Sequence, residues 1–516
     1  MDNIKVLWVD DEIDLLKPHI MFLTAKGYEI ASSNNGLEAI DMMKHTNYDI
    51  VFLDEQMPGL SGIETLSIIK SQFPDVPVVM ITKSEEENIM EDAIGSSIAD
   101  YLIKPVNPNQ ILLCLKKNLE NRRLVSEKTS SAYQQEFRKI SMELSSNLQP
   151  QEWIEIYKKI VFWELELEKS MDDGISSILK MQKDEANQSF SKYVERNYLN
   201  WFKDPNAVKP VMSHNLVKEK VFPLIENNKT LMLVIDNLRY DQWKILQPLL
   251  NEVYRTEIDD MYFSILPSAT QYARNALFSG LMPTQIDKKY PQYWVEESEE
   301  GTKNQFEEKL FEELLKRYGK NLKFTYHKVL NFQFGKKLAD NFSNHIGNPL
   351  NIIVYNFVDM LSHAHTEIEL IRELAENEAA YRSITLSWFE HSPLFDIIKQ
   401  AASKGVNLII TTDHGSIKVD NPVMVKGDRN TTTNLRYKIG KMLEVDEKKV
   451  FTVKNPEEIY LKKVNPSTSY IFGRNNDFFI YPNNYSQYVN YYKDTFQHGG
   501  ISMEEMMIPF VYLTPR

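Results

Sequence analysis

The segment "TLMLVIDNLRYD", Thr230 to Asp241, begins with a nearly continuous apolar run and passes directly into Asp236. An apolar run of this length is typical of a strand that is buried on both faces of a parallel sheet. Four later segments have the same character: MYFSIL (261–266), NIIVYNFVDM (351–360), VNLIITTDHG (406–415) and MIPFVYL (507–513). Residues 206–516 are therefore predicted to form an α/β sheet with helices between the strands.

Polar residues gather where these predicted strands end. Four of the five strands end in, or run straight into, Asp, His, Ser or Thr. In α/β sheets the chemistry lies beyond the carboxyl ends of the strands, so these residues are expected to meet at one edge. The candidate metal ligands are three aspartates and three histidines: Asp236, Asp359, His363, Asp413, His414 and His498.

The composition of this ligand set indicates the metal. Mixed carboxylate and imidazole ligation suits Zn²⁺, with Mn²⁺ as an alternative. Asp359 and His363 are four residues apart, a spacing that suits one metal ion on a helical turn but also a surface pair. A catalytic zinc normally uses three protein ligands, so six ligands favour two metal ions. For any ligand taken singly, a structural role is an equal alternative.

The segment "LPSATQYAR", Leu266 to Arg274, joins a predicted strand to a predicted helix. Its Thr270 is either a helix cap or a nucleophile, and the two roles are compatible because a helix N-terminus favours negative charge. Arg274 and Asn275 follow within about one turn, where an arginine fork matches phosphate geometry. Three weaker candidates, for which a solvated basic surface is an equal alternative, lie in the loop "KGDRNTTTNLRYK": Lys426, Arg429 and Arg436.

Residues 1–121 repeat the strand–helix alternation on a smaller scale, which predicts a second parallel sheet. The predicted strands are KVLWVDD (5–11), EIASS (29–33), DIVFLDE (49–55), VPVVMIT (76–82) and DYLIKPV (100–106). Their ends carry Asp10 and Asp11, Asp54, Thr82 and Lys104. Clustered carboxylates repel one another, so this edge predicts Mg²⁺ or a lysine between them, with Asp54 able to attack a phosphoryl donor. Singly, Asp10 and Asp11 can equally be helix caps, and Thr82 a turn residue.

Residues 122–205 contain three amphipathic stretches rich in Glu, Lys and Gln, which predict a helical bundle that links the two α/β regions. The region has no recognisable helix-turn-helix pattern and no basic recognition helix. The formal charge of −13 also argues against binding to duplex DNA through a large basic surface. A DNA-binding transcription factor is therefore the least favoured of the functions considered.

Composition predicts a cytoplasmic protein. The chain has 516 residues, enough for about three domains, and 42% of them are hydrophobic. A lone thiol, Cys114, excludes a disulfide framework within the chain and suits a reducing compartment. The sequence shows no secretory signal, and no apolar stretch approaches the length that spans a bilayer.

Two resemblances add expectations to these patterns. The motifs "VDDE", "LDEQMPG", "MITKS" and "YLIKPV" resemble the receiver domain of response regulators, a flavodoxin-like fold. That resemblance implies phosphorylation of Asp54 by a histidine kinase, Mg²⁺ bound by Asp10 and Asp11, and Thr82 and Tyr101 as switch residues. The ordered motifs of residues 210–516 resemble the alkaline phosphatase superfamily, and "VIDNLRYD", "TTDHG" and "HGGISMEEMMIP" look most like its PglZ branch.

The PglZ resemblance implies one Zn²⁺ held by Asp359, His363 and His498. It implies a second Zn²⁺ held by Asp236, Asp413 and His414, with Thr270 as the nucleophile that also contacts this metal. The whole order, a receiver (1–121), a helical linker (122–205) and a PglZ domain (206–516), resembles the response regulators of type IX secretion.

This last resemblance implies a sensor histidine kinase as a partner, possible contact with a sigma factor or secretion component, and homodimerisation on phosphorylation. It also implies phosphodiesterase action on nucleotide or oligonucleotide substrates. The predicted function is thus a signal-controlled two-zinc phosphodiesterase or phosphatase. The alternative is a metal-stabilised binding module that relays phosphorylation without catalysis.

Overall fold

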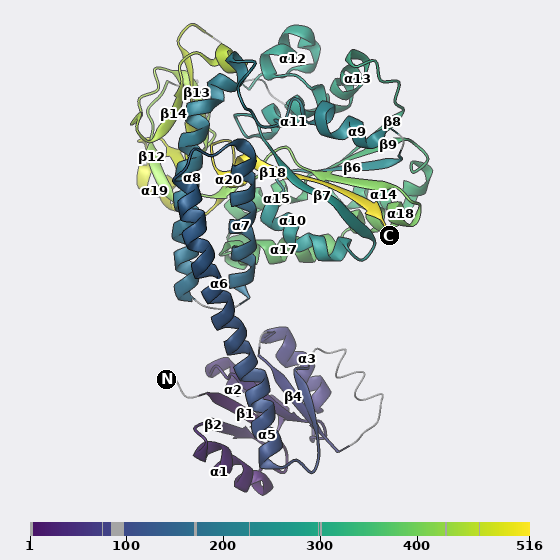
Figure 1. The fold of residues 1–516 in the computed structure, drawn as a ribbon, viewed down its shortest axis with the longest axis vertical. Coiled ribbons are helices and arrows are strands. Elements are labelled where there is room, and N and C mark those ends of the chain that lie inside the picture. The colour runs from purple at the N-terminus through teal and green to yellow at the C-terminus, as the bar shows by residue number, and fades with distance from the viewer. Residues whose placement is uncertain are drawn as a thin grey trace. The chain divides into compact units, whose positions relative to one another are not determined.

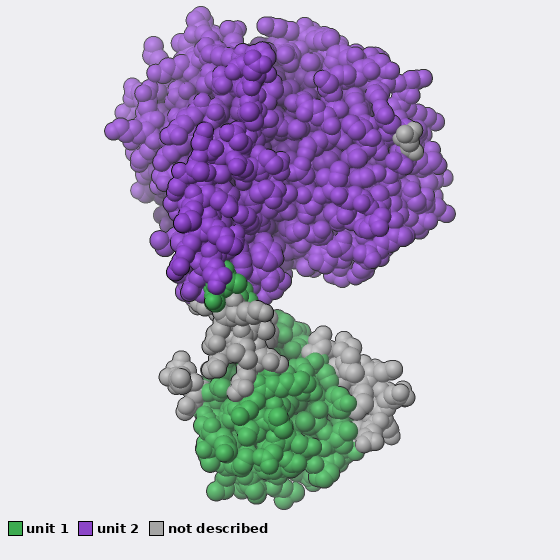
Figure 2. All heavy atoms as spheres, viewed as in Figure 1, with its two compact units in different colours: residues 1–133 green, residues 134–516 purple. Residues whose placement is uncertain are grey.

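The computed structural model describes residues 4–74, 76–83, 98–169, 173–226, 228–297, 299, 302–428, 431–463 and 465–516. The chain forms two compact units, residues 1–133 and 134–516, which Figure 2 colours separately. Helices and strands occur in both units, as Figure 1 shows, and this confirms the predicted α/β multidomain class. The three predicted domain ranges stay predictions.

The first unit contains a parallel five-stranded sheet with the order β2-β1-β3-β4-β5. Its strands are β1 (Lys5–Val9), β2 (Glu29–Ser33), β3 (Ile50–Asp54), β4 (Val78–Thr82) and β5 (Asp100–Ile103). Its helices include η1 (Ile13–Leu16), α1 (Lys17–Ala25), α2 (Gly36–His45), α3 (Gly62–Gln72) and α5 (Pro108–Leu115). This order is that of the flavodoxin-like doubly wound fold, so the predicted receiver architecture is confirmed.

Strand β1 shows why this sheet needs helices on both faces. Val6 and Trp8 lie in one buried apolar cluster, whereas Leu7 and Val9 lie in the other. Successive strand residues point to opposite faces, so an unbroken apolar strand is stable only when both faces are covered. The first polar residue after such a strand, here Asp10, is consequently placed at the sheet edge.

Three long helices follow, as the amphipathic pattern predicts: α6 (Asn121–Leu144), α7 (Pro150–Glu168) and α8 (Asp173–Lys203), with the π-helical turn η2 (Lys116–Glu120) before them. Helix α7 begins at Pro150, a residue that suits the first helical turn because it lacks the N–H left unpaired there. The aromatic rings of Trp153, Phe190 and Tyr193 pack together between α7 and α8. Both helices lie in the second compact unit together with the C-terminal sheet.

The second unit is built on a six-stranded sheet with the order β7-β18-β10-β6-β9-β8. Its strands are β6 (Thr230–Ile235), β7 (Tyr254–Phe263), β8 (Phe324–Val329), β9 (Leu350–Tyr355), β10 (Asn407–Thr411) and β18 (Met507–Pro515). Strands β10, β6, β9 and β8 are parallel, and β18 runs antiparallel to both β10 and β7. Strand β8 was not among the predicted strands, because "FTYHKV" is only half-buried and lacks a long apolar run.

Helices cover both faces of this sheet (Figure 1), with α10 and α17 on one side and α11 and α13 on the other. The α-helices between β6 and β10 are α10 (Tyr240–Leu250), α11 (Thr270–Ser279), α12 (Pro283–Lys289), α13 (Glu307–Arg317), α14 (Phe332–Asn341), α15 (Phe357–Glu367), α16 (Glu369–Leu374), α17 (Glu378–Glu390) and α18 (Pro393–Ser403). Before β6 lie η3 (Val217–Val221) and α9 (Phe222–Ile225), and late in the chain lie α19 (Tyr485–Tyr492) and α20 (Met503–Met506).

Short strands between β10 and β18 form three small sheets, none of which the sequence pattern predicted. They pair as β11-β17, β12-β16 and β13-β15-β14. Their bounds are β11 (Ile417–Lys418), β12 (Asn421–Met424), β13 (Tyr437–Lys441), β14 (Val450–Val453), β15 (Thr468–Gly473), β16 (Asp477–Ile480) and β17 (Phe496–Gln497). Segments of two to six residues are too short for periodicity to distinguish from loops.

Candidate active site

One edge of the six-stranded sheet collects the candidate site residues. Asp236 follows β6 directly, Asp359 lies in the first turn of α15 after β9, and Asp413 lies two residues beyond β10. These three strands are parallel, so their carboxyl ends meet. Strand β7 has the same direction as β10, because both are antiparallel to β18, and Thr270 follows it at the start of α11.

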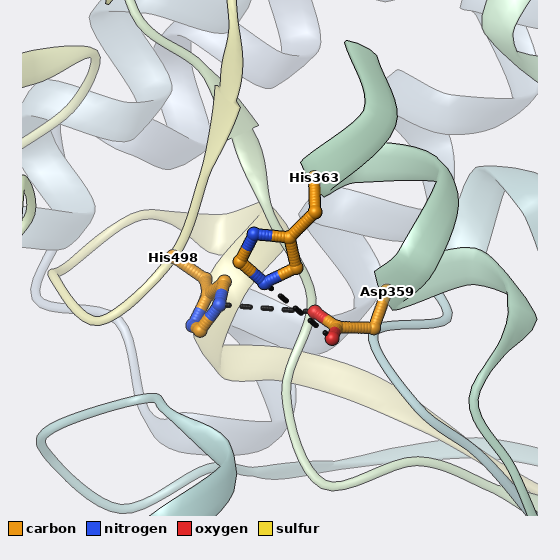
Figure 3. Close-up of side chains that lie close together, drawn as sticks. All are labelled: Asp359, His363 and His498. Atoms are coloured by element: carbon orange, nitrogen blue, oxygen red, sulfur yellow. Dashed lines mark ion pairs between the residues drawn. The ribbon is translucent and has the colours of Figure 1, made fainter. Parts of the chain in front are cut away.

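Asp359, His363 and His498 form the first ligand group (Figure 3). The ligand atoms of the three lie within 4.8 Å of one another. His363 Nε2 is 3.6 Å from Asp359 Oδ2, and His498 Nε2 is 3.9 Å from Asp359 Oδ1. Two ligands come from one turn of α15 and the third from the loop before α20, so the sheet edge unites residues far apart in sequence.

Asp236, Asp413 and His414 form the second group, which is completely buried. His414 Nε2 lies 3.7 Å from Asp236 Oδ1 and 3.7 Å from Asp413 Oδ2. His414 Nδ1 lies 3.1 Å from the carbonyl oxygen of Gly415, which can only accept, so Nδ1 carries a proton. Thr270 Oγ1 lies 2.9 Å from His414 Nε2, within hydrogen-bond distance.

The two groups are adjacent. The rings of His414 and His498 stack with their centroids 4.2 Å apart and their planes at 19°. His363 meets His498 edge-on at 6.4 Å between centroids. Thr270 therefore stands beside a continuous set of three imidazoles and three carboxylates, a geometry that suits two neighbouring metal ions.

Burial shifts the pKa values of the candidate ligands. It raises the pKa of Asp359 well above its usual range and raises that of Asp236 to about 6. Burial also opposes ionisation of Asp413, but the charges of His414 and Arg274 outweigh it and lower the pKa of that carboxyl. Burial lowers the pKa of His498 well below its usual range, with His414 and His363 adding to the shift, so His498 is neutral and able to ligate.

Three of the buried ligand oxygens have no hydrogen-bond partner among the described residues: Oδ1 of Asp236, Oδ1 of Asp359 and Oδ2 of Asp413. Buried polar atoms are nearly always satisfied, so orphaned atoms at one place call for a ligand that is not protein. Carboxylate oxygens with imidazole nitrogens form a donor set that zinc accepts. The residues present thus fit two divalent metal ions, and their roles as ligands remain predictions.

Arg274 is paired with carboxylates of the second group, so its guanidinium group is not free. Its Nη2 is 3.0 Å from Asp236 Oδ2, and its Nε is 2.9 Å from Glu307 Oε1 and 3.6 Å from Asp413 Oδ2. The sequence pattern did not single out Glu307, which lies in α13 and contributes no motif of its own. Arg274 offsets the charge of two candidate ligands, Asp236 and Asp413.

Asn275 is buried and its side-chain amide donates to the carbonyl oxygens of Gln271 and Lys303. This arrangement ties α11 to the loop before α13. The neighbouring hydroxyl of Ser268 donates to the carbonyl oxygen of Gly500, 2.8 Å away. Thr270 and Ser268 therefore have different surroundings although they lie two residues apart.

The weaker basic candidates fall into different environments. Lys426 is exposed and pairs with Glu444 at 3.4 Å. Arg436 is fully buried and makes a two-pronged contact with Glu505, which favours a structural role over substrate contact. Arg429 lies outside the described residues. Sequence reasoning missed Glu505, whose carboxylate also accepts from the backbone N–H of Gly500.

The first unit carries its own acidic site. Ligand oxygens of Asp10, Asp11 and Asp54 lie within 4.8 Å of one another, with Asp10 and Asp54 buried and Asp11 exposed. Lys104 Nζ lies 2.8 Å from Asp10 Oδ2 and 3.0 Å from Asp54 Oδ1. Burial raises the pKa of Asp54 although Lys104 opposes the shift. An all-oxygen set with an exposed member fits hydrated Mg²⁺.

The predicted switch residues lie near this site. The Thr82 hydroxyl donates to Glu55 Oε2 at 2.8 Å, and Glu55 follows Asp54 directly. Tyr101, at the second position of β5, has 41% of its surface exposed. Both positions are compatible with the switch roles that the receiver resemblance implies, and those roles remain predictions.

Three family models match the chain. The BREX system PglZ alkaline phosphatase-like domain matches residues 216–513, the PorX response regulator linker domain matches residues 123–202, and the response regulator receiver domain matches residues 6–116. Because the first match alone covers more than half of the chain, the chain belongs to the PglZ family. Its three matches together define a PorX-type response regulator with a PglZ output domain.

Similar curated proteins share only the receiver region. The transcriptional regulatory protein ZraR of Klebsiella oxytoca is 34% identical over 123 residues, 24% of this chain and 28% of that protein. The transcriptional regulatory protein ResD of Bacillus subtilis is 35% identical over 112 residues, 22% of this chain and 46% of that protein. The chain therefore covers less than half the length of either relative.

Among solved structures, chemotaxis protein CheY4 of Vibrio cholerae is 28% identical and covers 23% of this chain and 100% of its own, with a TM-score of 0.22. No helix in the described part of the chain is both long and apolar enough to cross a membrane. A receiver domain implies phosphorylation by a histidine kinase, and an alkaline phosphatase-like domain suggests a hydrolase of that superfamily.

Proposed function

We propose that the protein is a response regulator whose PglZ domain is a two-zinc phosphodiesterase or phosphatase acting on nucleotide-type phosphate esters through Thr270. One observation carries the proposal. Thr270 Oγ1 lies 2.9 Å from His414 Nε2, beside buried carboxylate oxygens that have no hydrogen-bond partner in the described chain. If Thr270 served only as a helix cap, its hydroxyl would not need to lie beside ligand atoms that have no hydrogen-bond partner.

The residues would divide the work as follows. Asp359, His363 and His498 would hold one Zn²⁺, and Asp236, Asp413 and His414 the other. When bound, the ions would supply the positive charge that favours the alkoxide of Thr270 and offsets charge on the phosphoryl oxygens. Arg274, which Glu307 engages, would contact a phosphoryl oxygen if a bound metal ion offset the charge of Asp236.

Catalysis would proceed by a covalent route. Thr270 Oγ1 forms a bond to phosphorus while the bond from phosphorus to the leaving oxygen breaks, and the hydroxyl proton passes to solvent. Water then attacks the phosphothreonine, which releases the phosphate product and regenerates Thr270. The first residue of α11 also benefits from the positive end of the helix dipole.

The decisive experiment replaces Thr270 by Ala in the zinc-loaded full chain. Turnover of bis(p-nitrophenyl) phosphate should fall to background, while bound zinc, measured by mass spectrometry, stays at the wild-type ratio. Ser268→Ala is the matched control, because it removes a hydroxyl two residues away that bonds only to backbone. Undiminished turnover in Thr270→Ala would remove Thr270 from the mechanism.

The regulatory half of the proposal rests on the receiver site. Asp54 would accept the phosphoryl group from a sensor histidine kinase, with Mg²⁺ held by Asp10, Asp11 and Asp54 and with Lys104 as the countercharge. We further propose, from the resemblance to PorX-type regulators with which the linker match agrees, a role in type IX secretion, homodimerisation on phosphorylation and a sigma factor or secretion component as a partner. Light scattering with and without beryllofluoride tests the dimer, and an unchanged mass would contradict it.

A metal-stabilised binding module remains the second candidate, since metal ions at these groups can also be structural. A zinc-loaded preparation that hydrolyses no member of a panel of phosphate mono- and diesters would favour it.

A further inference from the structure

The long helix α8 contacts the segment of chain that carries His498. Asn187 lies near the middle of α8 and is buried against α20 (Figure 1). Its Oδ1 accepts from the backbone N–H of Met503 at 2.7 Å, and its Nδ2 donates to Glu504 Oε2 at 2.9 Å. One amide thus serves as both acceptor and donor, so the two bonds fix its orientation and join α8 to the start of α20.

Two further residues of α8 contact the same segment. Lys183 Nζ lies 3.3 Å from Glu504 Oε1. The buried Ser191 Oγ lies 3.2 Å from the carbonyl oxygen of Ile501, within hydrogen-bond distance. Lys183, Asn187 and Ser191 follow one another at intervals of four residues, so they share one face of the helix. This face of α8 is the one turned toward the segment between His498 and α20.

The backbone between His498 and α20 is closely confined. Gly499 has a φ of +119°, a conformation that side chains rarely allow. A Cβ added at Gly500 would lie 2.5 Å from the carbonyl oxygen of Gly473, so the two backbones touch. Glu505 Oε1 accepts from the N–H of Gly500 at 2.9 Å and ties α20 back to this stretch. Because the connection is short and tightly packed, the position of α20 is expected to set the position of His498.

The same segment also abuts the second ligand group. The N–H of Gly415, the residue after His414, donates to the carbonyl oxygen of Glu505 at 3.2 Å. A Cβ added at Gly415 would lie 2.1 Å from the carbonyl oxygen of Glu504, so only glycine fits this contact. Residues 498–505 are therefore in contact both with α8 and with the turn that carries His414.

We propose that α8 is a positioning element of the zinc site, in which Asn187 holds α20, and through it His498, in place beside Asp359. Partners outside the ligand shell orient metal ligands, and losing them typically lowers metal affinity by about 10- to 100-fold. Asn187 and Ser191 fall within the linker match, residues 123–202, so the linker contributes to the site as well as connecting two domains. This inference rests on the proposed function and adds positioning residues to it.

Zinc binding by the full-length protein tests the proposal. Asn187→Leu removes both hydrogen bonds while keeping a side chain of similar volume. Competition with a chromophoric chelator should show one zinc ion bound as in the wild type and the other bound at least about 10-fold more weakly. Cobalt bound in place of zinc should show a changed visible spectrum, because its ligation by His498 is altered. Ser191→Ala, a milder change, should weaken the same zinc ion by a smaller factor.

Gln182→Leu is the matched control. Gln182 is another buried amide of α8, but it donates to the carbonyl oxygen of Phe137 in α6, at 3.0 Å. Both Asn187→Leu and Gln182→Leu should lower resistance to unfolding by urea, because each removes a buried hydrogen bond. Only Asn187→Leu should weaken zinc binding. Equal zinc affinities in the two variants would overturn the proposal.

A double-mutant cycle separates the positioning of His498 from a general loosening of the fold. In the His498→Ala background, Asn187→Leu should cause no further loss of zinc affinity, because its effect acts through His498. Losses that add in the double variant would contradict the proposal.

Hydrogen exchange gives a readout that needs no metal. Exchange of residues 498–505 in the zinc-free chain should be faster in Asn187→Leu than in the wild type, and unchanged in Gln182→Leu. The same rate in all three proteins would contradict the proposal. If the wild type binds two zinc ions but hydrolyses no phosphate ester, the proposed function fails, and the zinc titration still decides the role of Asn187.

Discussion

Two clusters of possible metal ligands in the second unit have a similar composition but differ in charge balance. Asp236, Asp413 and His414 form one, and Glu164, Asp241 and Glu378 form the other, each with ligand atoms within 4.8 Å. Both include a residue from the short stretch between β6 and the first turn of α10. Proximity of carboxylates alone would therefore predict two metal centres.

In the cluster of Glu164, Asp241 and Glu378, each carboxylate contacts at least two cations. Arg382 Nη1 lies 2.8 Å from Glu164 and 2.9 Å from Asp241, and Lys183 Nζ lies 3.0 Å from Glu164 and 2.9 Å from Glu378. Arg239 makes a two-pronged contact with Asp241. This cluster is a completed ion network that fastens α7 and α8 to the sheet domain.

The Asp236 cluster is only partly compensated. Asp236 and Asp413 share Arg274, which Glu307 also engages, and ligand oxygens are left without hydrogen bonds. We infer from this difference that missing positive charge, rather than the number of acids, marks the Asp236 cluster as the candidate metal site. The receiver site is intermediate, because Lys104 contacts two of its carboxylates and Asp11 stays exposed.

The sharpest test of this comparison exchanges one acid in each cluster for its amide. Asp236→Asn should reduce hydrolysis of bis(p-nitrophenyl) phosphate by about 1,000-fold or more, because it removes a predicted ligand next to the nucleophile. Bound zinc, measured by mass spectrometry, should fall in parallel. Asp241→Asn, five residues on, should leave zinc content and the activity of the folded fraction close to wild type. Equal loss of zinc in both variants would contradict the distinction between a candidate metal site and a structural ion network.

Removing a cation from the completed network should destabilise the fold. Arg382→Met leaves Glu164 and Asp241 buried with fewer partners, and breaking a buried pair in this way costs about 3 kcal/mol or more. Urea unfolding of the second unit should show the loss directly. Lys399→Met, which breaks an exposed pair with Asp396, should change the free energy of unfolding by less than about 0.5 kcal/mol. A loss of that small size in Arg382→Met would mean that the network contributes little.

Metal addition should separate the two units. Zinc at about 100 times its dissociation constant should raise the free energy of unfolding of the second unit by about 2.7 kcal/mol for each ion bound, or about 5 kcal/mol for two, since it binds only the folded sites. Magnesium at the same excess should instead protect peptides of β1 and β3 in hydrogen-exchange measurements. Protection of the second unit by magnesium to the same extent would contradict the assignment of different metals to the two sites.

The smallest expected effect concerns Asp54. Its raised pKa, caused first by burial, means that the folded state binds this proton more strongly than the unfolded state. The ionised carboxylate thus lowers stability once the pH rises through the folded pKa. Asp54→Asn should therefore stabilise the receiver at pH 7, and this gain should vanish below the unfolded pKa of about 3.9.

Hydrogen exchange of β1 and β3 peptides across urea concentrations measures this gain, with the exposed Asp41→Asn as the matched control. A gain that persists below pH 3.9, or a loss of stability at pH 7, would contradict the assigned sign.

Much of the fold followed from local sequence pattern. Apolar runs such as "IVFLD" and "TLMLVI" can only be strands covered on both faces, and they form β3 and β6. Strand direction then places the next polar residue at one sheet edge, which is why Asp236, Asp413 and Thr270 could be grouped before their positions were known. Strand β8 and the short strands β11 to β17 were not predicted, because few of their residues carry a periodic signal.

Within the candidate site, the sequence determined the set of donors, and the tertiary structure decided the charge around them. Nothing local to Asp236 or Asp241 indicates that one is left short of cations while Arg239 and Arg382 surround the other. Nor does it indicate that Glu307 engages Arg274, or that the rings of Tyr272 and Tyr437 meet edge-on. These contacts join residues far apart in the chain. They depend on side-chain directions that are fixed only when helices pack on the sheet, because a local pattern encodes which face a residue occupies but not which partner it meets there.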